Sequence, residues 1–223
     1  MHYPSAWLQG SSRGESIASH LRLQIINESI KPGEILSENK VAELFEASRS
    51  PVREAFKLLA GEGLIRLERM GAVVVGLDLT HIQELYDVRY LIESFAQQRL
   101  AKRDNAAMLV RLEQTVDRMK LAVKHGDEVE FAFQDFSFHE MIVQEAGHTR
   151  IWHLWNSIRS IVRTVMLLTT ANSFRQGKER MEWVADKHLT VIEGLRSGNE
   201  EQIAKIVKAY FADSDETLGR SLS

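Results

Sequence analysis

The sequence predicts a mainly α-helical protein in two parts, an N-terminal domain of three helices with a β-hairpin and a C-terminal all-α bundle of six helices. Apolar residues recur at helical spacing along most of the chain. Only GLIRLERMGAVVVGLD, residues 63–78, has the two short apolar runs typical of paired strands. Gly71 lies between those runs and is expected to supply the hairpin turn.

The helices of the N-terminal part are bounded by clear breaks. The first is expected from Ser16 to about Ser29, before the Pro32-Gly33 pair breaks it. Ser37 is expected to cap a short second helix. The third is expected over 51–60, and the glycine at 61 ends it.

The start of the third helix raises a question of charge. Ser50 precedes a proline and is typical of a helix cap, yet Arg49 and Arg53 flank it. Cations are disfavoured at a helix N-terminus, which already carries partial positive charge. Either an external anion binds there, or the two arginines fold back onto acids such as Glu46 or Glu54.

The order of elements favours the external anion. A short helix, a tight turn and a helix with a polar, basic start form a helix-turn-helix, whose second helix enters the DNA major groove. The hairpin that follows would be a wing against the DNA backbone. DNA phosphates and guanine edges then supply the partner that the two arginines lack.

From about residue 80 onward the pattern is helical throughout. The expected helices span 80–102, 104–125, 128–147, 149–170, 174–198 and 199–220. The expected organisation is a flexible arm over 1–14, a winged helix-turn-helix domain over 15–76, a linker over 77–79 and a helical effector-binding and dimerisation domain over 80–223.

Composition restricts the protein class further. The chain has no cysteine, so disulfides and thiolate metal sites are excluded. The N-terminus lacks the pattern of a secretory signal, and no window has the apolar length of a membrane span. A cytoplasmic protein is therefore expected. The net charge is −3, so any phosphate-binding surface must be local.

Several segments resemble the GntR family of bacterial transcription regulators, in its FadR-like branch. The winged-helix signature is similar to ILSENKVAELFEASRSPVREAFKLLAGEGLIRL. The helical effector domain, called FCD, is similar to LTHIQELYDVRYLIESFAQQRLAK, DFSFHEMIVQEAGH and DKHLTVIEGLRSGN, and six helices point to a VanR-like subgroup.

This resemblance implies a homodimer that binds a pseudo-palindromic operator in double-stranded DNA. It places the DNA contacts at Ser48, Arg49, Ser50, Arg53 and the wing tip near Gly71. Asn39 stands where the family often has arginine, and it can still bind phosphate or an adenine edge.

Some polar residues lie on helix faces whose other residues are apolar and are expected in the core. Asp135 and His139 are four residues apart and reach one point, and His188 occupies an inward stripe of a later helix. A carboxylate and two imidazoles are suited to a divalent metal ion. The alternative is structural: Asp135 hydrogen-bonds His139, and His188 is a satisfied core histidine.

The resemblance adds a metal pattern and candidates for effector binding. Metal-binding members of the family use an aspartate and a histidine on one helix with two further histidines, and the last position falls near Tyr210 here. Neutral phenol is a poor ligand, so three good ligands remain, for zinc, nickel or another borderline ion. The candidates for effector binding are Arg89, which faces inward, Tyr210 on the inner stripe of the last helix, and Arg159 and Arg163. The last two lie four residues apart and either clamp an anion or form a solvated face.

Together these features predict a ligand-responsive transcription regulator, a repressor that senses a small carboxylate through a metal-containing pocket. The competing hypothesis is a metal-dependent enzyme using Asp135, His139 and His188, since catalytic metals also keep an open position. An enzyme has no need for a helix-turn-helix and a wing, so the regulator is favoured and no catalytic residue is assigned.

Overall fold

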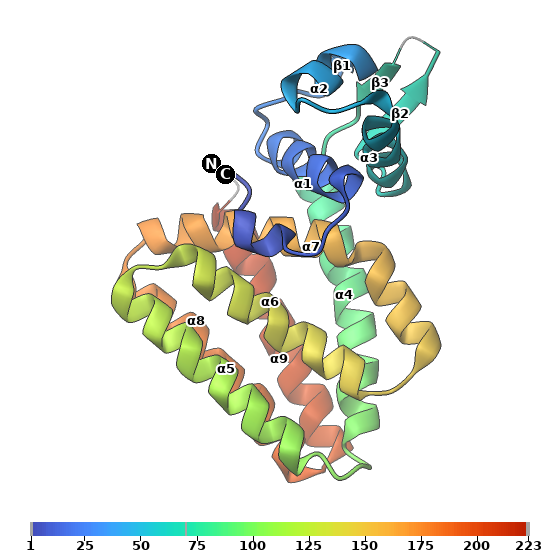
Figure 1. The fold of residues 1–223 in the computed structure, drawn as a ribbon. Helices are drawn as coiled ribbons and strands as arrows, with labels where there is room; N and C mark the ends of the chain where they lie inside the picture. The colour runs from blue at the N-terminus through green and yellow to red at the C-terminus, as the bar shows by residue number, and fades with distance from the viewer. Residues whose placement is uncertain (1, 70, 222–223) are drawn as a thin grey trace. The chain divides into compact units, whose positions relative to one another are not determined.

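The computed structural model describes residues 2–69 and 71–221, with side chains through residue 213. The chain divides into two compact units, one ending at Asp78 and one beginning at Leu79 (Figure 1). Helices dominate both units, and the strands of the described residues form one small sheet in the first unit. The predicted mainly α-helical fold class is confirmed.

The N-terminal unit is a three-helix core with a small antiparallel sheet. Its helices are α1 (Arg13–Ile26), α2 (Glu38–Leu44) and α3 (Arg49–Gly61). Its strands β1 (Ile35–Leu36), β2 (Ile65–Glu68) and β3 (Gly71–Val74) lie in the order β1-β3-β2. Both α1 and α2 pack against α3, because α3 buries an amphipathic face that includes Val52, Phe56 and Leu59.

The structure corrects the start of α1. The helix begins at Arg13, because Ser12 and Glu15 form a reciprocal capping box that satisfies two backbone N–H groups. Residues ahead of it, expected to be an arm, include a 3₁₀ turn over Ser5–Leu8. The ring of Tyr3 contacts the rings of Trp7 and His20 there.

The expected caps of α2 and α3 are also corrected. Ser37 occupies the cap position of α2, but its side chain makes no capping hydrogen bond. The cap position of α3 is Ser48 rather than Ser50, so Pro51 lies within the first turn, where its missing N–H is tolerated. Arg49 is thus the first residue of the helix.

The hairpin differs from its prediction in two ways. Gly71 is not a turn residue but the first residue of β3, where it pairs with Glu68, and its neighbour Met70 lies outside the described residues. A third strand, β1, pairs with β3 through Ile35 and Leu36. Two residues are too short a run to show an alternating pattern, so sequence reasoning missed it.

The second unit contains the six helices α4 (Leu79–Leu100), α5 (Ala106–His125), α6 (Glu128–Glu145), α7 (Thr149–Arg175), α8 (Lys178–Ser197) and α9 (Glu200–Ser221) within the described residues. Helix α6 packs against α4, α5 and α7, while α9 packs against α4 and α8 (Figure 1). Its fully buried aromatic side chains include Phe131, Phe136, Phe138 and Trp155. None of the described helices combines the length and apolarity needed to span a bilayer.

One predicted helix break is wrong. Helix α7 continues through Ala171 and Asn172 to Arg175, where a break was expected. A lone asparagine lowers helix propensity only slightly. The chain instead turns at Gly177, whose φ of 113° is a conformation that favours glycine.

The position of Gly71 generates a stability prediction. Its φ is 142°, and a Cβ atom there would lie 2.6 Å from the carbonyl oxygen of Leu36. Gly71→Ala is therefore expected to destabilise the wing by ~1–3 kcal/mol, measured as faster amide hydrogen exchange in β1–β3.

Gly61→Ala is the matched control. Gly61 lies in α3 with nothing within 4 Å of an added Cβ, and its φ is not positive. Alanine there should leave exchange in the sheet unchanged. Equal protection of the sheet in the Gly71 variant would contradict the assigned clash.

Candidate functional site

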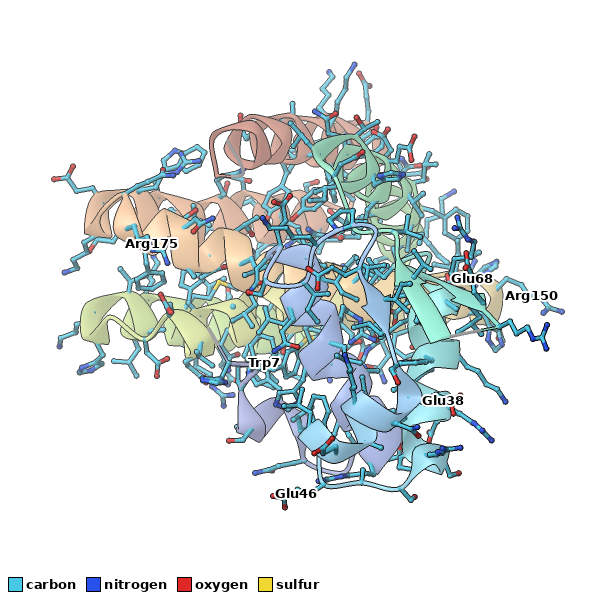
Figure 2. The ribbon with its side chains drawn as sticks, turned by 90° about the horizontal axis from the view of Figure 1, so that it is seen from above. Trp7, Glu38, Glu46, Glu68, Arg150 and Arg175 are labelled. Atoms are coloured by element: carbon cyan, nitrogen blue, oxygen red, sulfur yellow. The ribbon has the colours of Figure 1, made fainter. Side chains whose placement is uncertain are left out.

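A groove in the N-terminal unit gathers the residues expected to contact DNA. It is lined by α2, the start of α3 and the wing: Ser37, Glu38, Asn39, Arg49, Arg53, Phe56, Leu67, Glu68, Arg69 and Gly71. Figure 2 labels Glu38 at the start of α2 and Glu68 at the end of β2. Ser48 and Ser50 are exposed beside this groove on the first turn of α3.

The two arginines of the groove have different partners. The Nε of Arg53 donates to both carboxylate oxygens of Glu38, at 3.0 and 2.9 Å, rather than to Glu46 or Glu54. Arg49 is exposed, and no described carboxylate lies within ion-pair distance of it. The charge at the start of α3 is therefore only partly compensated within the chain.

In the second unit, three predicted metal ligands come together. Asp135 and His139 lie one turn apart on α6, and His188 reaches them from α8. Their ligand atoms all lie within 4.8 Å of one another. Asp135 Oδ1 is 3.0 Å from His188 Nε2 and 3.4 Å from His139 Nε2.

Tyr210 of α9 joins this cluster. Its hydroxyl lies 3.0 Å from His139 Nε2 and 3.1 Å from His188 Nε2. Both imidazoles are buried, with 1% and 0% of their surface exposed. The four side chains thus converge from α6, α8 and α9 on one buried point.

The outer nitrogen of each histidine is held by a separate acceptor. His139 Nδ1 lies 2.5 Å from Glu93 Oε2, and His188 Nδ1 lies 2.9 Å from the carbonyl oxygen of Val184. A proton on each Nδ1 satisfies both contacts and leaves the Nε2 lone pairs aimed at Asp135. Histidines that bind metal ions are oriented in this way.

The donor set fits a cation. With both histidines neutral, two Nε2 lone pairs and the Asp135 carboxylate face one another, and the only proton among them is that of the Tyr210 hydroxyl. Buried acceptors that face each other without a proton are unfavourable. A divalent ion would supply positive charge at this point, and two nitrogens with a carboxylate oxygen are a donor set that suits borderline ions.

The ionisation of this region follows from burial and pairing. Burial raises the pKa of the Glu93 carboxyl, but the Arg89 guanidinium and the hydrogen bonds from Arg89 and His139 outweigh it, so this pKa lies below its usual range. Burial also raises the pKa of Asp135, yet its contacts with the His139 and His188 side chains hold that pKa well below normal. Both acids are therefore anionic.

A pocket adjoins the cluster and carries cationic and hydroxyl groups. Its lining includes Arg89, Asp135, Lys187 and Tyr210, together with Thr169, Thr170, Ser173 and Trp183. Arg89 Nε donates to Glu93 at 2.6 Å, while its buried Nη2 has no hydrogen-bond partner among the described residues. Burial lowers the pKa of Lys187. An anion in the pocket would satisfy the open Arg89 group.

The other predicted effector residues lie elsewhere. Arg159 donates to both carboxylate oxygens of Glu140 on α6, and its guanidinium lies 5.7 Å from the Phe136 ring. Neither Arg159 nor Arg163 lines the pocket described above. Of the four expected effector residues, the structure brings only Arg89 and Tyr210 to the cluster.

Comparisons with known proteins agree with this architecture. Residues 13–75 match the bacterial regulatory proteins of the gntR family, and residues 84–213 match the FCD domain. The gluconate operon transcriptional repressor of Bacillus licheniformis is 39% identical over 211 residues, covering 95% of this chain and 87% of that protein. The same repressor of Bacillus subtilis (strain 168) gives the same identity and coverage.

The chain belongs to the GntR family. It is a ligand-responsive, DNA-binding transcription regulator with an FCD domain, not an enzyme. Among solved structures, E. coli McbR/YncC shares the fold with a TM-score of 0.72 at 15% identity, over 95% of this chain and 99% of that one. Lar of Listeria monocytogenes gives 0.67 at 22% identity, over 94% and 98%.

Sequence reasoning gave no role to three residues of this GntR-family site. Glu93 lies four residues after Arg89, a spacing that favours an ion pair on a helix. Its second contact, with His139, joins residues far apart in the sequence and has no local pattern. Lys187 lies next to His188 and gave no distinct pattern. Glu38 follows the cap of α2 as a first-turn acid, a common position that gives no distinct pattern.

Proposed function

We propose that this regulator is a homodimeric repressor whose affinity for a pseudo-palindromic operator is set by a small organic acid bound over a divalent metal ion. The observation that carries this proposal is the Arg89 Nη2 group, which is buried and has no hydrogen-bond partner among the described residues, on a side chain that lines the pocket beside Asp135. A buried cationic donor of this kind is satisfied by an anionic ligand.

DNA binding is assigned to the groove at the start of α3. Arg49 is open to an external anion, and Arg53 becomes available when its exposed pair with Glu38 separates. Exposed pairs of this kind stabilise by about 0–1 kcal/mol, so a DNA phosphate or guanine edge competes readily. Asn39, Ser48, Ser50 and Gly71 surround the same surface and are proposed to complete the contact.

Dimerisation is assigned to the second unit. Val88, Leu91 and Phe95 lie on α4 with 41%, 66% and 42% of their surfaces exposed. Their spacing of three and four residues puts them on one face of that helix. A second copy of the chain would cover this apolar stripe and set two recognition helices for a two-fold site.

The DNA assignment predicts the effect of two substitutions. Arg49→Ala and Arg53→Ala should each weaken operator binding by ~1–3 kcal/mol if the arginine contacts a guanine. If it contacts only phosphate, affinity should fall on all sequences and the salt dependence should shrink by about one unit of slope. Fluorescence anisotropy over a range of salt concentrations distinguishes the two contacts.

Lys57→Ala is the control for these variants. Lys57 is exposed on α3, one turn beyond Arg53, and does not line the groove. Its removal should change operator affinity less than either arginine does. Unchanged affinity in both arginine variants contradicts the placement of the recognition helix, and one chain per operator contradicts the dimer.

The metal assignment rests on the donor geometry described above. Asp135, His139 and His188 would hold a divalent ion, zinc or nickel by their nitrogen and oxygen donors. When bound, the ion supplies a positive site for a carboxylate. Arg89 would bind the same anion from α4, and Glu93 keeps that arginine oriented.

The chemistry of the pocket narrows the acid. Thr169, Thr170 and Ser173 bring three buried hydroxyl side chains to its wall. Hydroxyl walls suit a ligand that itself carries hydroxyls, because its polar groups then remain hydrogen-bonded. The Bacillus relatives are named as gluconate operon repressors. A sugar acid such as gluconate is therefore the effector we propose.

His139→Ala tests the metal and the acid together. It should lower both metal content and the thermal stabilisation by gluconate, because the ligand and its anion site are lost together. His153→Ala, an exposed histidine on α7, should keep both. Glucose and hexanoate, lacking the carboxylate and the hydroxyls respectively, should stabilise the wild type less than gluconate. Full metal content and a normal response in the His139 variant would place the effector elsewhere.

Coupling to DNA is assigned to α4. This helix begins at Leu79, directly after the N-terminal unit ends at Asp78, and it carries Arg89. A ligand changes DNA affinity only if it binds two conformations differently. We propose that anion binding at Arg89 shifts α4 and so changes the spacing of the recognition helices, which must match ~34 Å on DNA.

Arg89→Lys tests this coupling while leaving Glu93 a cationic partner. DNA binding without effector should stay close to wild type, and the change in operator affinity on adding gluconate should be largely lost. Arg99→Lys, on the same helix but outside the pocket, should respond normally. An intact response in the Arg89 variant would remove the proposed link.

A further inference from the structure

The hydroxyl of Tyr210 lies between the two histidines of the cluster. Its hydroxyl lies at nearly equal distances, 3.0 and 3.1 Å, from the Nε2 atoms of His139 and His188. One phenolic proton can serve only one of these two acceptors. With each histidine neutral and protonated on Nδ1, neither Nε2 can donate to the phenolic oxygen, so a hydrogen bond accounts for only one of the two close contacts.

The distances match the edges of a coordination polyhedron. Two ligand atoms that are each ~2.1 Å from a metal ion lie about 3.0 Å apart at right angles and about 3.4 Å apart at the tetrahedral angle. Asp135 Oδ1 is 3.0 and 3.4 Å from the two histidine nitrogens. The Tyr210 oxygen, at 3.0 and 3.1 Å from the same nitrogens, satisfies the same spacing.

Tyr210 is also held in place by its surroundings. Its ring packs edge-on against the rings of His139, His188 and Phe211. The ammonium of Lys187 lies 4.6 Å from the ring centre and donates to the Tyr210 backbone carbonyl at 3.2 Å. The side chain is fully packed with its oxygen at the cluster, so binding a metal ion requires no rearrangement of α9.

We propose that the Tyr210 hydroxyl oxygen is the fourth protein ligand of the metal site, beside Asp135, His139 and His188. This inference rests on the metal centre proposed above and specifies its ligands. The donor set becomes two nitrogens and two oxygens. On binding, the metal–oxygen bond forms as the phenolic O–H bond breaks, and the proton is released to solvent.

The consequence concerns which positions remain for the effector. With four protein ligands, a tetrahedral ion has no open position, whereas a six-coordinate ion keeps two. The pocket side of the cluster, lined by Arg89 and Asp135, is where a carboxylate would complete the larger shell. The response to effector should therefore require a metal ion that accepts six ligands.

The test uses copper(II) alone as a spectroscopic probe, added to the full-length protein without effector. A phenolate bound to copper(II) gives a charge-transfer band in the visible region and tyrosinate ring modes in resonance Raman spectra. Wild type should show both signals at one ion per chain. Tyr210→Phe should lose both signals and bind the ion at least tenfold more weakly.

Two variants control for the loss of a buried hydroxyl. Tyr86→Phe removes the hydroxyl of another tyrosine lining the pocket, one that packs against Arg89, and it should keep both signals. Tyr210→His should regain affinity without any tyrosinate signal, since imidazole is also a ligand. Thermal denaturation of the metal-free variants confirms that each is folded before metal is added.

The outcomes separate this inference from the proposal on which it rests. Binding that depends on His139, with no tyrosinate signal and equal affinity in Tyr210→Phe, overturns the fourth ligand and leaves the metal centre intact. Binding that is absent in wild type, or unchanged in His139→Ala, overturns the metal centre and this inference together.

Discussion

The arrangement of the helical pocket depends on the Glu93 carboxylate. This group has no exposed surface, and its two oxygens face different partners, Arg89 Nε at 2.6 Å and His139 Nδ1 at 2.5 Å. An isolated carboxylate at such a depth would cost several kcal/mol. Its two donors offset that cost and are themselves fixed by it, so one buried anion orients both a cation and an imidazole.

The orientation has chemical consequences on each side. Glu93 engages Arg89 through Nε, and the buried Nη2 of the same guanidinium has no hydrogen-bond partner among the described residues. Because Glu93 engages His139 through Nδ1, the Nε2 lone pair faces Asp135. The Nδ1 of His188 instead contacts the Val184 carbonyl, so the two imidazoles are oriented by different acceptors.

The sequence was most informative where the determinants are local. The four-residue spacing of Asp135 and His139 predicted one shared point, because helical geometry alone brings them together. The contact between Glu93 and His139 depends on how α4 packs against α6, which no local pattern encodes. The role of Gly71 was misassigned because β1, its neighbour across the sheet, is only two residues long.

The two arginines at the start of α3 are cations whose charge also needs a compensating anion. Both are exposed, and among the described residues only Arg53 forms an ion pair with an acid of the chain, Glu38. If Arg53 contacts DNA as proposed, its exposed pair with Glu38 must first separate, at a cost of about 0–1 kcal/mol. Arg49 has no such pair to break. The positive charge at the start of α3 is therefore compensated by an acid of the chain at Arg53 and left for an external anion at Arg49.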